Sequence, residues 1–163
     1  MKFLDLILKQ TCKQGEEVCG DVFLSERVRG AQIYILCDGI GSGVYANVSA
    51  IYSANRLLEL IRSDVSLQDS CRILTESMHR ARTEDVPFAA FSVFRVLPDG
   101  NFVGYSYEAP RPLIIQEGRA RVMAAQQYQV GKEFFYEYAG ILFQGDQIIL
   151  YSDGVTQAGM GKG

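Results

Sequence analysis

Apolar residues recur at helical spacing in two stretches of the first half of the chain. After residue 43 they return every three or four positions, which predicts a helix with one apolar face. That face would consist of Val44, Val48, Ile51, Ala54, Leu58 and Ile61. A second helix is expected to begin near Ser66, whose hydroxyl can cap the first amides, and to end before Pro87, because proline cannot continue a helix. Its apolar positions are Leu67, Cys71, Leu74, Met78 and Ala81.

Other stretches carry the pattern of β-strands. Residues 31–37 are apolar at nearly every position, which is typical of a strand that is covered on both faces. From residue 88 onward, short runs rich in β-branched and aromatic residues are separated by turn residues, and they predict an antiparallel meander. The runs are 88–97, 101–107, 112–116, 119–125, 132–143 and 147–152.

Helices that bury one face and strands that are buried on both faces can share one core in a layered arrangement. We therefore expect an α+β fold in which an antiparallel β-sandwich is flanked by helices. A chain of 163 residues suits a single domain, and no repeat or linker divides it. Residues 1–163 are accordingly predicted to form one domain.

Composition and charge narrow the class of protein. Apolar residues make up 48% of the chain and charged residues 21%, as in ordinary globular proteins. The net charge is only -3 and basic residues are scattered, which argues against binding to nucleic acid or to an anionic membrane. No apolar run approaches the roughly 20 residues that span a bilayer. The first ten residues include Asp5 and lack a leader cleavage site, so a cytoplasmic location is expected.

The chain has four cysteines and no C-x-x-C pair. Cys37 and Cys71 lie within apolar patterns, where a free thiol packs as a small hydrophobic group. Cys12 and Cys19 are expected to be structural or incidental rather than metal ligands, because no further ligands accompany them. This usage favours a reducing compartment.

Three Asp-Gly pairs occur, and they differ in context. Asp99-Gly100 lies between two strand-like runs and is a tight-turn signal that needs no other function. Asp38-Gly39 closes the apolar strand 31–37, and Asp153-Gly154 follows another strand-like run. Asp21 adds a third carboxylate at the start of a strand, next to Gly20.

Carboxylates at strand ends suggest a site for cations if the fold brings them together. Three of them in one place would repel one another unless a cation were present. Ligand sets made only of oxygen select hard cations such as Mg²⁺ or Mn²⁺. Spacing along the chain does not by itself place Asp21, Asp38 and Asp153 in contact.

Three segments, taken together, resemble the signature of PPM-type metal-dependent serine/threonine phosphatases. The resemblance is strongest to the branch named for stage II sporulation protein E. The segments are Gly20-Asp21, Cys37–Gly43 with the following helix that contains Ala46, and Leu150–Ala158. They are spread over nearly the whole chain, and their combination is more specific than any one of them.

The resemblance implies a central β-sandwich with two Mn²⁺ or Mg²⁺ ions at one end. Asp38 would bridge both ions, while Asp21 and the Gly39 carbonyl would each ligate one. Asp153 would complete the second ion's ligands. The implied enzyme is a phosphoprotein phosphatase, a hydrolase that acts through a metal-activated water, with Asp21, Asp38 and Asp153 as its catalytic residues.

The sequence departs from the family pattern in three places. Ser42 stands where many relatives have histidine, which leaves the proton donor unassigned. Glu108-Ala109-Pro110-Arg111 replaces an Asn-Ala-Gly-His motif, and Arg111 is expected to be a solvated loop residue. Relatives also have a further Asp ligand downstream, whereas no Asp follows Asp153. We expect the C-terminal part of the fold to be missing from this sequence, which would leave the metal site incomplete.

The position of Asp21 suggests a class of partner. Only 20 residues precede it, which leaves no room for a sensor or membrane domain. This arrangement resembles the small stand-alone feedback phosphatases of the stressosome. The implied substrate is a phosphorylated regulatory protein with a sulfate-transporter-and-antagonist type domain, in signal transduction during a stress response. Neither nucleic acid nor a membrane is an expected partner.

Two other functions remain possible from the sequence. A non-catalytic module of the same fold could bind a phosphoprotein without hydrolysing it, as a missing ligand would permit. The glycines at 39, 41 and 43 are typical of a nucleotide-binding turn, but the spacing misses the dinucleotide fingerprint and the rest of the chain lacks alternating strands and helices. His79, the only histidine, is interpreted as a solvated helix residue.

Overall fold

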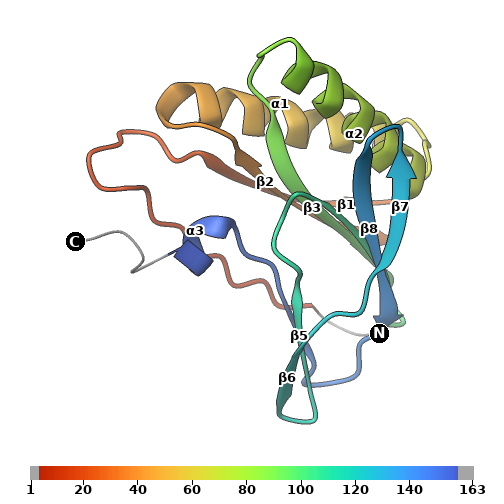
Figure 1. Cartoon of the computed structure of the whole chain (residues 1–163). Helices are drawn as coiled ribbons and strands as arrows, with labels where there is room; N and C mark the ends of the chain where they lie inside the picture. Colours follow the sequence, from red (N-terminus) through yellow and green to blue (C-terminus); the bar gives the residue numbers. More distant parts are fainter. Residues whose placement is uncertain (1–3, 158–163) are drawn as a thin grey trace.

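Two antiparallel sheets and three helices make up residues 4–157, the part of the chain that the structure, a computed structural model, describes (Figure 1). The larger sheet has the strand order β1-β2-β3-β4-β8-β7. These strands are β1 (Asp21–Val28), β2 (Ala31–Gly39), β3 (Ala89–Val96), β4 (Asn101–Tyr107), β8 (Glu133–Ile141) and β7 (Gln126–Val130). The smaller sheet, in the order β6-β5-β9, consists of β6 (Arg119–Val122), β5 (Leu113–Gln116) and β9 (Gln147–Ile149).

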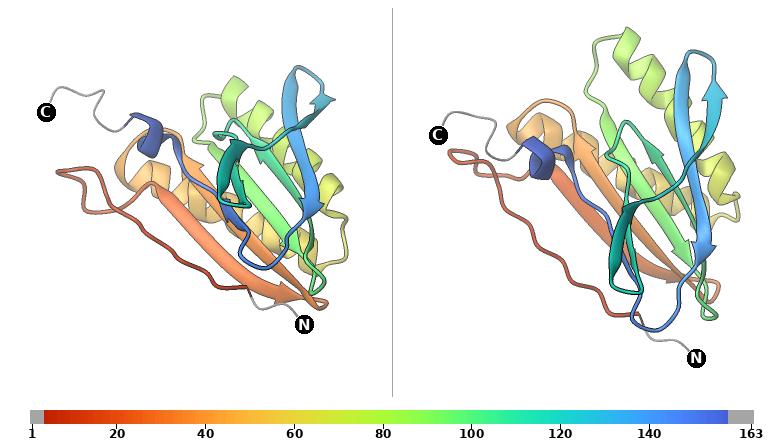
Figure 2. Two further views of the ribbon diagram at one scale, coloured as in Figure 1. Left: turned by 90° about the horizontal axis from the view of Figure 1, so that it is seen from below. Right: turned by 60° about the horizontal axis from the view of Figure 1, so that its bottom comes forward.

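The larger sheet is covered on both faces, as its apolar strands require. Helices α1 (Gly43–Arg62) and α2 (Leu67–Thr83) lie on one face, and the smaller sheet lies on the other (Figure 2). One core joins the helices to the sheet and includes Ile35, Leu57 and Leu74. A second core lies between the sheets and includes Phe94 and Ile114. The predicted α+β sandwich is confirmed.

The helical predictions are confirmed in extent but only partly in orientation. In α2 the Ser66 hydroxyl accepts a hydrogen bond from the Asp69 amide at 3.0 Å, and Cys71, Leu74 and Met78 are buried as expected. In α1 the predicted apolar face is wrong over its first half. Val44, Val48 and Ile51 of that face are exposed, and the helix instead buries its smallest side chains there. These are Ala46, Ser49, Ala50, Ser53 and Ala54.

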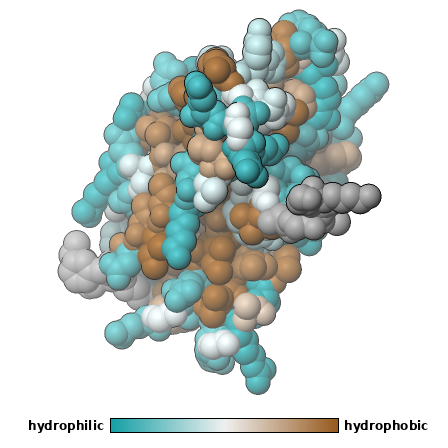
Figure 3. Space-filling view, turned by 90° about the vertical axis from the view of Figure 1, so that its left-hand side faces the viewer, coloured by the Kyte–Doolittle hydropathy of each residue, from teal (hydrophilic) through white to brown (hydrophobic). Residues whose placement is uncertain are grey.

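The reason is the close approach of α1 to the sheet. A Cβ atom added to Gly39 at the end of β2 would lie only 1.7 Å from the Ala46 carbonyl oxygen. Only glycine on the strand and small residues on the helix allow this spacing. The larger apolar side chains in the first half of α1, Val44, Val48 and Ile51, therefore face outward. Apolar residues also gather on the face of the molecule seen in Figure 3.

The second half of the chain is not a simple meander. The Asp99-Gly100 hairpin between β3 and β4 is confirmed, but after β4 the chain leaves for the smaller sheet and returns to the larger one as β7 and β8. Strand β7 was missed, because its glutamine-rich sequence has little β-strand pattern. No helix among residues 4–157 is long and apolar enough to cross a membrane.

Candidate active site

Strand register places two of the three carboxylates side by side. Asp21 is the first residue of β1, and its cross-strand partner in β2 is Asp38. Side chains that are directly opposite in an antiparallel pair point to the same face, with Cβ atoms about 5 Å apart. The two residues are 17 positions apart in the chain and are brought together by one hairpin, whose register local sequence patterns could not predict.

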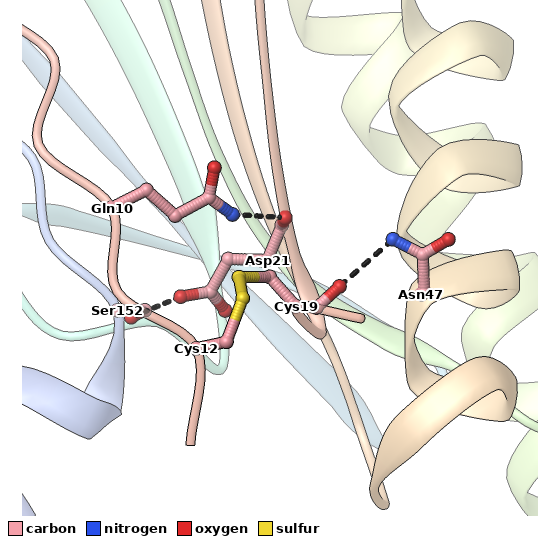
Figure 4. Close-up of a disulfide and its surroundings, with 6 residues drawn as sticks. All are labelled: Gln10, Cys12, Cys19, Asp21, Asn47 and Ser152. Atoms are coloured by element: carbon pink, nitrogen blue, oxygen red, sulfur yellow. Dashed lines mark hydrogen bonds between the residues drawn. A yellow bond between two sulfur atoms is a disulfide. The ribbon is translucent and has the colours of Figure 1, made fainter. Parts of the chain in front are cut away.

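The third carboxylate arrives from the other sheet. After β9 the chain reaches Ser152, whose hydroxyl donates a hydrogen bond of 2.7 Å to Oδ2 of Asp21 (Figure 4). Asp153 follows directly at the start of the short helix α3 (Asp153–Gln157), where its side chain lies within hydrogen-bonding reach of Asp38. The fold thus brings together Asp21, Asp38 and Asp153, whose convergence the sequence could not establish.

Asp38 is at the centre of this group and is affected most by it. Its pKa is raised to about 8, first by burial and then by the charges of Asp21 and Asp153 and the hydrogen bonds to both. In the described part of the chain, no Lys or Arg forms an ion pair with any of the three. The negative charge of the group is therefore not offset by a neighbouring basic side chain.

Gly39 and the loop that follows it lie directly after Asp38 at the end of β2. The Gly39 amide donates a hydrogen bond of 3.0 Å to the carbonyl of Gly20, which ties the segments before β1 and at the end of β2 together. Ser42, which stands in place of the family's histidine, is the exposed N-cap residue of α1, and its side chain caps no amide. Glu16, which the sequence analysis did not consider, reaches the same loop, because its Oε2 lies 3.0 Å from where a Cβ of Gly43 would stand.

A small cavity opens beside Asp38. Its volume of about 10 Å³ is near that needed for a single water. The cavity is lined by Leu36, Asp38, Ala90, Ser92, Ala109, Pro110, Tyr151 and Ser152. The loop that departs from the family motif thus contributes Ala109 and Pro110 to the site. Arg111 is exposed and stacks over the ring of Tyr136 at 5.7 Å, in keeping with its interpretation as a surface residue.

The three carboxylates are neighbours, but the described residues do not form a complete metal site. Within residues 4–157, no group of three or more His, Cys, Asp or Glu side chains is arranged to hold a metal ion.

A disulfide between Cys12 and Cys19 closes the loop just before Asp21, and the sequence analysis did not predict it. The Cys19 carbonyl accepts a hydrogen bond of 2.8 Å from Asn47 of α1, and Gln10 donates one of 2.8 Å to the Asp21 carbonyl (Figure 4). A disulfide is not expected in the reducing compartment that the cysteine usage favoured. Cys37 and Cys71 are free and buried, as predicted.

His79 is a partly exposed residue of α2, as its sequence context indicated, but it also has a partner that the sequence did not predict. Its Nδ1 lies 3.0 Å from Oε1 of Glu133, the nearly buried first residue of β8. Glu133 comes from 54 positions away, so the pairing depends on how α2 packs against the sheet.

The chain is similar to several phosphatase structures. It aligns with the PP2C phosphatase domain of the cell-fate determinant SpoIIE from Bacillus subtilis with a TM-score of 0.76 and 16% identity, covering 90% of this chain and 44% of that one. RsbX, solved in complex with magnesium, gives 0.68 and 17%, with coverage of 90% and 72%. A protein from a study of the bacterial stressosome gives 0.69 and 21%, with coverage of 88% and 73%. At these identities the likeness shows the fold alone.

Sequence comparison adds the family. No curated protein matches the chain in sequence. The family model described as stage II sporulation protein E (SpoIIE) matches residues 29–163, which is most of the chain and includes Asp38, Gly39 and Asp153. The chain therefore belongs to the stage II sporulation protein E family of PPM-type phosphoprotein phosphatases.

Proposed function

We propose that this chain removes phosphate from phosphoserine or phosphothreonine on a regulatory partner protein, at the site formed by Asp21, Asp38 and Asp153. The observation that carries the proposal is the half-buried Asp38, which lies between two further carboxylates from distant segments and has a strongly raised pKa. Such an arrangement is costly for a bare protein and is characteristic of functional sites.

The donor set fits divalent metal ions. PPM phosphatases depend on Mg²⁺ or Mn²⁺, and three carboxylates without paired basic side chains supply the hard oxygen ligands that these ions prefer. Asp38 would bridge two ions, with Asp21 and the Gly39 carbonyl on one and Asp153 on the other. A bound cation would also offset the repulsion among the three carboxylates. It would therefore favour the ionised form of Asp38 and lower the Asp38 pKa.

Bound there, the ions would supply an acidified water as nucleophile and neutralise charge on the phosphoryl group. The chain's own residues would hold the ions and orient the phosphoryl group. Asp38 lines the small cavity together with Ala109 and Pro110. The Gly41–Gly43 loop adds no charged side chain of its own, although the Glu16 carboxylate lies beside Gly43.

The partner proposed is a phosphoprotein with a sulfate-transporter-and-antagonist type domain. Two structural neighbours support this class: RsbX, and a protein from work on the bacterial stressosome. The carboxylates lie at an exposed end of the sandwich, with Asp153 itself exposed, so a phosphorylated side chain on a folded protein can reach them.

One observation favours a second candidate. The described residues do not form a complete metal site. A module of this fold that binds a phosphoprotein without hydrolysing it would need no such site. Hydrolysis separates the two candidates.

The test measures release of phosphate from a chromogenic phosphate ester, and then from a phosphorylated partner domain, by the full chain with Mn²⁺ or Mg²⁺. We expect turnover that requires the metal and that falls at least ~100-fold in Asp38→Asn, since loss of the bridging charge removes several kcal/mol of stabilisation. Asp64→Asn is the matched control, because Asp64 is an exposed carboxylate far from the site in the ion pair with Arg29.

Two results would contradict the proposal. Metal-independent turnover, or turnover that Asp38→Asn leaves intact, would exclude this site. Absence of turnover combined with tight binding of the phosphorylated domain would favour the binding module instead.

A further inference from the structure

The Ser152 hydroxyl donates a hydrogen bond to the Asp21 carboxylate, with Oγ 2.7 Å from Oδ2. We propose that Ser152 is a positioning residue, which sets the orientation of the Asp21 carboxylate for ion binding. This inference rests on the proposed function, because it assigns Asp21 as a ligand.

The first argument is topological. Ser152 follows β9 of the smaller sheet, whereas Asp21 opens β1 of the larger sheet, 131 positions earlier. The hydrogen bond therefore ties the two sheets together at the site. Because Asp153 is the next residue, the same bond also fixes the approach of the third carboxylate to Asp38.

The second argument concerns the freedom that Asp21 retains. Its backbone is already held: Asp21 pairs with Asp38 across the sheet, and its carbonyl accepts a hydrogen bond from Gln10 (Figure 4). The disulfide and Asn47 fix the residues just before it. What remains is rotation of the side chain, and the Ser152 hydroxyl is placed to restrict it.

The third argument is chemical. A hydroxyl donates one hydrogen bond, here to Oδ2 of Asp21, and does not itself occupy the other carboxylate oxygen. It also carries no charge, so it stabilises the ionised carboxylate without competing with a cation, as a Lys or Arg at the same place would. Hydrogen bonds that orient metal ligands in this way commonly contribute 10–100-fold to metal affinity or activity.

The experiment compares Ser152→Ala, Ser152→Thr and the wild-type chain. The readouts are the Mn²⁺ dissociation constant from calorimetry and the metal-free melting temperature. Ser77→Ala is the matched control, because Ser77 is a half-buried serine whose hydroxyl donates to the Ile73 carbonyl in α2, away from the site. We expect Ser152→Ala to bind Mn²⁺ about 10-fold more weakly, Ser152→Thr to recover most of the loss, and Ser77→Ala to bind like the wild type.

A second comparison keeps the inference falsifiable if the fold is perturbed. In an Asp21→Asn background, Ser152→Ala should weaken Mn²⁺ binding no further, because its effect passes through Asp21. An equal loss in both backgrounds, an unchanged dissociation constant in Ser152→Ala, or failure of Ser152→Thr to recover binding would each overturn the role of Ser152. If the wild-type chain itself bound no Mn²⁺ and hydrolysed no phosphate ester, the proposed function would fail instead.

Discussion

At the scale of single residues, the site depends on positions where only one side-chain type fits. Gly39 carries no charge and no side chain, yet it decides where α1 can lie relative to β2. The Ala46 carbonyl occupies the space that any Cβ at position 39 would need. Because Asp38 is the preceding residue, a shift of this strand end would also move the central carboxylate.

Replacement of Gly39 by alanine tests this close approach. We expect Gly39→Ala to lower the free energy of unfolding by about 3 kcal/mol, since an overpacked site must displace the helix backbone. Calorimetric melting measures the loss, which corresponds to roughly 6–12 °C for a domain of this size. Gly154→Ala is the control, because its Cβ would meet nothing closer than 3.8 Å. A Gly39→Ala chain that melts with the wild type would show that α1 does not sit so close to the sheet.

At the scale of elements, the ends of strands and helices and the short connections beside them present the functional groups. The segment before β1 is an irregular loop, and it is held by the Cys12–Cys19 disulfide, by Asn47 and by Gln10. The Cys37–Gly43 and Ser152–Asp153 segments likewise lie where strands end and helices begin. Loops on a rigid scaffold commonly carry binding groups in this way.

The disulfide's contribution to stability follows from the loop it closes. Cys12 and Cys19 are separated by 7 positions, for which chain entropy predicts about 2 kcal/mol of stabilisation. Urea unfolding with and without a thiol reductant should therefore differ by this amount. A Cys12→Ser, Cys19→Ser double variant should match the reduced wild type and be insensitive to reductant. Equal stability of the reduced and oxidised wild type would mean that the bond does not restrain the unfolded chain.

At the scale of the whole molecule, polar contacts supplement the two apolar cores in joining the helix layer to the larger sheet. Glu133 at the start of β8 is nearly buried and binds His79 of α2 through one oxygen. Its other oxygen accepts a hydrogen bond of 2.9 Å from the Tyr107 hydroxyl of β4. Arg82 of α2 lies 3.6 Å away and also pairs with Glu108. The helix layer is thereby linked to two strands of the sheet.

These contacts predict a pH dependence of stability. Burial alone would raise the pKa of Glu133, but the hydrogen bonds from His79 and Tyr107 and the charges of Arg82 and His79 outweigh it and lower the pKa. A lowered folded-state pKa gives stability that is present above the unfolded-state pKa, near 4.5, and lost as the pH falls through the folded value.

Glu133→Gln should therefore cost about 1–3 kcal/mol at pH 7, and the difference from wild type should shrink below about pH 4. Urea unfolding at both pH values measures it. Glu59→Gln, in the exposed pair with Arg56, should change stability by less than about 1 kcal/mol at either pH. A Glu133→Gln deficit that stayed constant with pH would show that the carboxylate's charge is not what links the layers.

The sequence by itself determined the local elements and the candidate site residues Asp21, Asp38 and Asp153. Periodicity located both long helices, and capping chemistry fixed the start of α2 at Ser66. The resemblance of three segments to known phosphatases, Gly20-Asp21, Cys37–Gly43 and Leu150–Ala158, predicted the family, and the family model confirms it. These properties depend on neighbours within a few positions, so they can be read from a single chain.

Only the tertiary structure decided which groups meet. The Asp21–Asp38 pairing depends on strand register, and the Ser152–Asp21 bond spans 131 positions between two sheets. The outward turn of Val44 and Val48 depends on how closely α1 approaches Gly39, which periodicity does not encode. The His79–Glu133 pair likewise depends on layer packing. Contacts between distant segments depend on how whole layers fit together, and local patterns carry no information about that fit.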